Sequence, residues 1–101
     1  MSALDDINKY TTADAGVVAA MEKTYALALQ NADARLVSFS DADELKTVRE
    51  NFVKGKLGVT DADADIDAAI AAVGERVPGH KQRLTVYYLL AEHYGKLGSL
   101  S

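Results

Sequence analysis

The chain has 101 residues and a mass of 10.8 kDa, and 49% of its residues are hydrophobic and 26% charged, as in one ordinary soluble domain. It contains no Cys, which excludes disulfides, thiolate nucleophiles, iron–sulfur clusters and zinc sites that need sulfur. The formal net charge of -4 argues against nucleic acid and anionic lipid as partners of the whole molecule. Two acids within residues 1–6, together with the absence of a long apolar run, predict a cytoplasmic protein that does not enter the membrane.

The chain is expected to be helical throughout, because it has a single Pro and is rich in Ala and Leu. The first expected helix, over residues 2–7, is short and is capped by Ser2. The second begins at Thr12 and extends to about residue 31, with apolar residues at every third or fourth position. Residues 32–38 are expected to form one further helical turn.

Two helices in the middle of the chain begin with the same kind of start signal. Ser40 and Thr60 each precede a run of acids, which favour the positive end of a helix. Gly55 or Gly58 is expected to end the helix that begins at Ser40. The dipeptide of Pro78 and Gly79 ends the helix that begins at Thr60.

The last expected helix, over residues 81–97, differs from the others because residues 86–91 are apolar all round. In a soluble chain such a helix is buried on several sides. The sequence therefore predicts an all-α, compact single domain over residues 1–101, in which about five helices surround a buried C-terminal helix.

Several packing strings in the chain resemble a family of small bacterial proteins known as a domain of unknown function. The strings are VRENF at 48–52 followed by KLG at 56–58, YYLLAE at 87–92 followed by GKL at 95–97, LVS at 36–38, and SD at 40–41. The resemblance covers nearly the whole chain. It implies a compact helical fold with EF-hand-like helix pairs and no known calcium binding, and it implies no activity.

Acids at alternate positions in residues 61–67 are typical of the start of a calcium loop. In that register Ile66 stands where the sharp turn needs Gly, and Ala72 stands where the bidentate Glu belongs. We therefore interpret the stretch as the acidic first turn of a helix, and a metal role is the alternative that stays open.

Three potential cations lie at the start of the last expected helix, namely His80, Lys81 and Arg83. Cations near free helical amides could contact a small anion or a nucleic-acid phosphate. The alternative is that these residues pair with the acids of residues 61–67 or extend into water.

Four further basic residues, Lys46, Arg49, Lys54 and Lys56, lie within one helix and its exit. Glu50 is four residues from both Lys46 and Lys54, so it could pair with either. We interpret the group as a solvated helix face and not as a nucleic-acid surface, which needs more cations and exposed aromatic residues.

The sequence contains no Ser-centred turn motif and no phosphate-binding glycine loop, and its only histidines are His80 and His93. We therefore expect no enzymatic activity, no catalytic residue, no resident metal and no cofactor. The predicted function is that of a protein–protein interaction or regulatory module of a bacterial cytoplasm, with another protein or a second copy as partner. The alternative is a binder of a small anion or phosphate at the start of the last helix.

Overall fold

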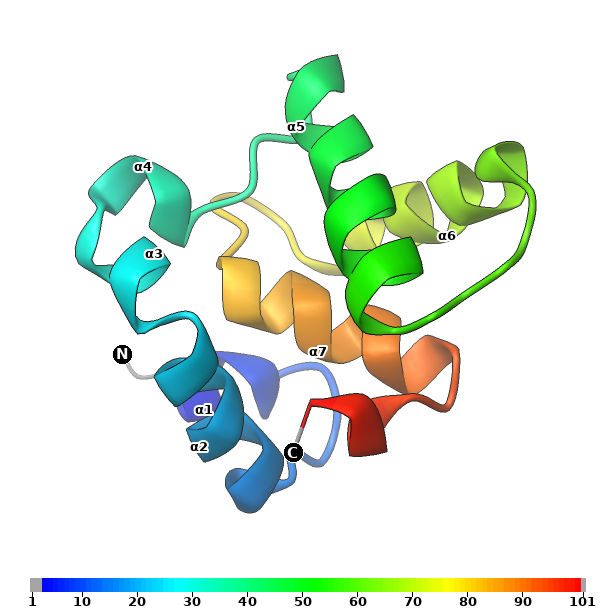
Figure 1. The fold of residues 1–101 in the computed structure, drawn as a ribbon. Coiled ribbons are helices and arrows are strands. Elements are labelled where there is room, and N and C mark those ends of the chain that lie inside the picture. The colour runs from blue at the N-terminus through cyan, green and yellow to red at the C-terminus, as the bar shows by residue number, and fades with distance from the viewer. Residues whose placement is uncertain (1–2, 101) are drawn as a thin grey trace.

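The computed structural model describes residues 3–100 and, at residues 32 and 33, the backbone alone. Secondary structure in this range is helical, apart from an isolated antiparallel bridge between Leu36 and Gln82. In chain order the elements are α1 (Ala3–Ile7), α2 (Ala15–Thr24), α3 (Ala26–Gln30), α4 (Ala32–Arg35), α5 (Ala42–Thr47), the π-helix η1 (Val48–Lys56), α6 (Asp63–Arg76), α7 (Arg83–His93) and the 3-10 turn η2 (Leu97–Ser99) (Figure 1). The expected all-α fold class is confirmed. None of the helices in residues 3–100 combines the length and the apolarity needed to cross a membrane.

Helix α7 lies at the centre of the molecule, as Figure 1 shows in orange. All its residues from Leu84 to Ala91 are buried, and α1, α2, α4, α6 and η1 contact it. Burial on all sides is the consequence of a helix that has no polar face. The radius of gyration of 12.3 Å is close to the value of about 13 Å expected for a compact chain of this length.

The capping residues of two helices differ from the prediction. Asp14, and not Thr12, caps α2, because its carboxylate accepts the backbone N–H groups of residues 16 and 17 at 2.9 and 3.3 Å. Asp41, and not Ser40, caps α5 in the same way. In each case the helix is capped by an Asp that follows the predicted Ser or Thr. Asp, Ser and Thr are all favoured N-cap residues. The predicted cap Ser2 lies outside the described residues.

Other helix ends were also misplaced. The helix expected from Thr12 to about residue 31 is divided at Tyr25 into α2 and α3. Helix α6 begins at Asp63 and not at Thr60, and its cap makes no side-chain hydrogen bond. Helix α7 ends four residues before the predicted end at residue 97, because Gly95 turns the chain with a φ of 66°.

The π-helix η1 was not predicted, since the sequence signals favour an ordinary α-helix over this segment. The Leu57 N–H donates to the Phe52 carbonyl, five residues earlier, at 2.9 Å. Val48 and Val53 are fully buried, and Phe52 and Leu57 are nearly so. Each of these two pairs is five residues apart, so the i→i+5 register brings both members of a pair into the core.

Candidate binding groove between α5 and α6

A groove of about 730 Å³ lies between α5 and α6 and extends along the first turn of η1. Its apolar lining is formed by Phe39, Ala42, Leu45, Ile70, Ala71 and Gly74. Its charged rim is formed by Asp43, Lys46, Arg49, Asp67, Glu75 and Lys81. Ligand pockets typically have a volume of about 300 to 1,000 Å³, a mostly apolar lining and a few polar or charged groups.

One end of the groove is shaped by the contact between Phe39 and Gly74. A Cβ atom on Gly74 would lie only 2.5 Å from the Phe39 ring, so the ring packs directly against the backbone of α6. The Lys81 ammonium lies over the same ring, 5.6 Å from its centroid. Sequence reasoning missed this contact, although a Gly inside an apolar helical stripe is a signal of close packing.

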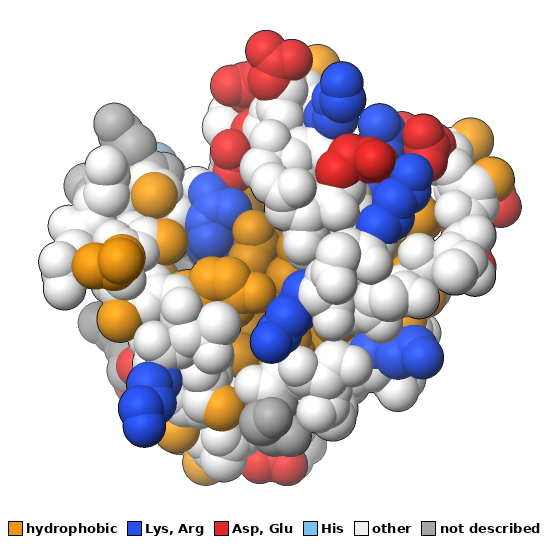
Figure 2. All heavy atoms as spheres, viewed as in Figure 1, with side chains coloured by type: hydrophobic (Ala, Val, Ile, Leu, Met, Phe, Trp, Pro, Cys, Tyr) orange, Lys and Arg blue, Asp and Glu red, His pale blue; other side chains and the backbone are white. Residues whose placement is uncertain are grey.

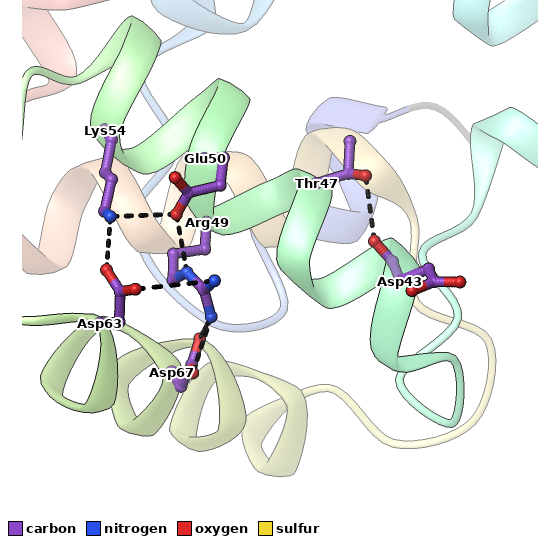
Figure 3. A network of polar contacts seen from close by, with 7 residues as sticks. All are labelled: Asp43, Thr47, Arg49, Glu50, Lys54, Asp63 and Asp67. Atoms are coloured by element: carbon purple, nitrogen blue, oxygen red, sulfur yellow. Dashed lines mark hydrogen bonds and ion pairs between the residues drawn. The ribbon is translucent and has the colours of Figure 1, made fainter.

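At the other end of the groove, Arg49 and Asp67 belong to a network of ion pairs, which we call the ion clasp (Figure 3). It consists of Arg49, Glu50 and Lys54 of η1 and Asp63 and Asp67 of α6. Arg49 Nη1 donates to both carboxylate oxygens of Asp67 at 3.0 and 3.1 Å, and its Nε donates to Glu50 at 2.8 Å. Lys54 pairs with Glu50 at 3.0 Å and also with Asp63. The clasp therefore joins η1 to the beginning of α6.

Two of the four basic residues that we interpreted as a solvated helix face, Arg49 and Lys54, instead pair with acids of α6 in the clasp. Glu50 pairs with Lys54 and Arg49, and not with Lys46. Hydrogen bonds with Glu50 and Asp67 raise the pKa of Arg49. Hydrogen bonds with Arg49 and, to a smaller extent, with Lys54 lower the pKa of Glu50. A separate hydrogen bond from Lys54 to Asp63 lowers the pKa of Asp63.

Of the acids in residues 61–67, Asp63 and Asp65 form the acidic first turn that we expected, whereas Asp61 precedes α6 and Asp67 lies beyond its first turn. Asp63 and Asp67 face the cations of η1. In the part of the chain that the structure describes, no group of three or more His, Cys, Asp or Glu side chains is placed to hold a metal ion.

Arg83 has a different partner from the predicted acids of residues 61–67. Its guanidinium pairs with Glu44 at 2.6 Å and donates to the Tyr87 hydroxyl at 2.8 Å. It also donates to the backbone carbonyls of Ala34 and Leu36, so it joins α7 to the end of α4 and to α5. Burial acts to lower the pKa of Arg83, but Tyr87 and Glu44 outweigh it and raise this pKa.

Tyr87 belongs to an aromatic cluster beneath Arg83. Its ring stacks on Phe52 at 3.8 Å and meets Tyr25 edge-on at 5.3 Å between centroids. Burial, followed by the neighbouring Tyr87, raises the pKa of Tyr25 to about 12. Figure 2 shows apolar side chains in a hollow between the α2–α4 segment and η1.

The other two predicted anion contacts, His80 and Lys81, line a second cavity of about 680 Å³ beside the groove. His80 is exposed, and the Lys81 ammonium donates to the Gly79 carbonyl at 3.1 Å. Because Arg83 is bound to Glu44, these two residues do not form a cluster of three free cations with it. The predicted anion contact stays a prediction.

The family model described as "Protein of unknown function (DUF2853)" matches residues 2–98. The chain belongs to this family. The match covers the packing strings at residues 36–58 and 87–97, and it confirms the resemblance to an uncharacterised domain family. No curated protein matches the chain. The bacterial origin and the EF-hand-like pairing of helices stay predictions.

Proposed function

We propose that the protein is a non-enzymatic interaction module of the cytoplasm and that the groove between α5 and α6 binds a segment of a partner protein. The observation that carries the proposal is the open apolar lining of the groove. Phe39 and Leu45 are only partly buried there, and Ala42 and Ala71 are exposed. An apolar centre surrounded by charged residues is the usual composition of a protein interface.

The position of the charges supports a docking role for the groove. Arg49 and Asp67 bind each other where they line the groove, so neither of them adds an uncompensated charge to it. A partner side chain that enters the centre therefore displaces water from apolar surface without separating an ion pair, which is how interface anchors contribute most of their binding energy.

A matched pair of substitutions tests the proposal. Ala71 and Ala72 are neighbours on α6 and both are exposed, but only Ala71 lines the groove. The full chain would be used to select binders from a phage library of random peptides, and the selected peptides would then be titrated against Ala71→Arg and Ala72→Arg.

We expect the selected peptides to bind the Ala72→Arg variant with the wild-type Kd and the Ala71→Arg variant at least about tenfold more weakly, since Arg fills the groove. Urea midpoints of the two variants would verify that both are folded. If no peptide is enriched, or if the peptides bind both variants equally, the groove is not the binding site.

A further inference from the structure

We propose that the partner segment is both apolar and acidic, with an apolar side chain in the groove and a carboxylate in the second cavity beside His80 and Lys81. This inference rests on the proposed function and names the chemistry of the partner.

The groove and the second cavity are adjacent parts of one surface. Both are lined by Phe39 and Lys81, and the Lys81 side chain lies over the Phe39 ring between them. A segment that places one side chain on the apolar lining can therefore place a neighbouring side chain in the second cavity. The hydroxyls of Ser38 and Ser40 also line that cavity.

The acids of the second cavity are already engaged within the protein. The Asp41 carboxylate accepts two backbone N–H groups at the start of α5, at 2.9 and 3.3 Å. The Glu44 carboxylate binds Arg83 at 2.6 Å. Figure 2 shows acidic side chains gathered over this end of α5. The charge of Glu44 is thus compensated by Arg83, and the carboxylate of Asp41 is stabilised by the positive end of the helix that it caps.

The basic residues of the second cavity, His80 and Lys81, are not engaged in this way. Among the described residues, neither His80 nor Lys81 forms an ion pair. The Lys81 ammonium has three donors, and one of them is used by the Gly79 carbonyl. A carboxylate that accepts from Lys81 would form a charge-assisted hydrogen bond, whereas a basic side chain would meet a like charge.

The rim of the groove itself does not select a charge. It carries Asp43 and Glu75 as well as Lys46, and Arg49 and Asp67 compensate each other. The charge preference of the site is therefore set by the second cavity, through the Lys81 ammonium.

The experiment uses the peptides selected on the full chain. A synthetic copy of an enriched peptide would be compared with a copy in which each Glu or Asp is changed to its amide. Both would be titrated against the wild type, Lys81→Gln and the control Lys56→Gln, which alters an exposed Lys outside both cavities.

We expect the enriched sequences to place Asp or Glu within a few residues of an apolar anchor, and Lys81→Gln to weaken the acidic peptide about five- to tenfold. The amide peptide should bind the wild type and Lys81→Gln equally, and Lys56→Gln should have no effect. The difference between the two peptides should decrease as salt is added.

The outcomes separate the two proposals. Peptides that need an open groove at Ala71 but carry no acids, or carry basic residues, would contradict the acidic partner and leave the interaction module intact. The same conclusion follows if Lys81→Gln weakens both peptides equally. The absence of any groove-dependent peptide would contradict both proposals.

Discussion

Arg49 and Lys54 lie five residues apart in η1, and both contact the carboxylate of Asp63 in α6. In an α-helix, residues five apart point about 140° away from each other, so the two cations would not face one neighbouring helix. The i→i+5 register of η1 reduces this angle. The register is fixed mainly by the burial of Val53 and Leu57, because burying such side chains stabilises far more than exposed ion pairs do. The ion clasp is thus a consequence of core packing.

The clasp should make stability sensitive to acid. The pKa values of Glu50 and Asp63 are lowered in the native state, so the native state binds fewer protons than the unfolded state near pH 4. The free energy of unfolding should therefore fall as the pH is lowered through about 4.5 to 3. Urea unfolding of Asp63→Asn should show a shallower fall than that of Asp65→Asn, another acid in the first turn of α6. Equal slopes would show that the clasp does not contribute.

The central position of α7 predicts a large cost for truncating it. Leu90 is 0% exposed, and Leu90→Ala should destabilise the protein by about 2 to 5 kcal/mol through lost burial and a cavity. Leu27 is 83% exposed, and Leu27→Ala should change stability by less than about 0.5 kcal/mol. Urea midpoints decide the comparison, and similar values for the two variants would place α7 at a surface.

The contact between Phe39 and Gly74 predicts a change of sign in a double-mutant cycle. Gly74→Ala alone should cost about 1 to 3 kcal/mol, because the new methyl group overlaps the Phe39 ring. In a Phe39→Ala background the overlap is absent, and the same change should stabilise by up to about 1 kcal/mol, since Ala favours helix over Gly. If Gly74→Ala has the same effect in both backgrounds, the ring does not pack on α6.

Arg83 should be more important for stability than its neighbour Lys81. Replacing Arg83 by Gln leaves Glu44 partly buried without its cation and removes hydrogen bonds to two backbone carbonyls, which should cost about 1 to 3 kcal/mol. Lys81→Gln removes one exposed hydrogen bond and the contact of the ammonium with the Phe39 ring, and should cost less than about 1 kcal/mol. Thermal or urea unfolding of the two variants measures the difference, and a smaller cost for Arg83 would contradict its role in joining α4, α5 and α7.

The aromatic cluster predicts a loss of stability in alkali. The Tyr25 pKa is about 12 in the native state, so between about pH 10 and that value only the unfolded state ionises at this residue. The free energy of unfolding should fall as the pH rises through this range. In Tyr25→Phe the fall should be smaller, and unchanged behaviour would indicate that Tyr25 ionises normally in the folded protein.

Features that depend only on residues adjacent in the sequence could be predicted without the structure. Residues 86–91 are apolar on every side, and this requires a buried helix wherever the rest of the chain lies. Pro78 and Gly79 end α6, and Gly58 ends η1. These helix ends could be predicted because the fixed φ of Pro and the left-handed conformation open to Gly are properties of the residues themselves. The helix starts were predicted only to within a few residues, since Ser, Thr and Asp compete as caps at adjacent positions.

The candidate site depends on contacts between distant segments, and only the tertiary structure decided them. Phe39 meets Gly74, and Arg83 meets Glu44, through packing that no local pattern specifies. Several basic residues could pair with the acids of residues 61–67, and the sequence does not show which basic residue each acid contacts. The π register of η1 places Arg49 and Lys54 beside these acids. The register arises because the core buries Val53 and Leu57, and this burial outweighs the preference for a regular α-helix, which is all that local helix propensities describe.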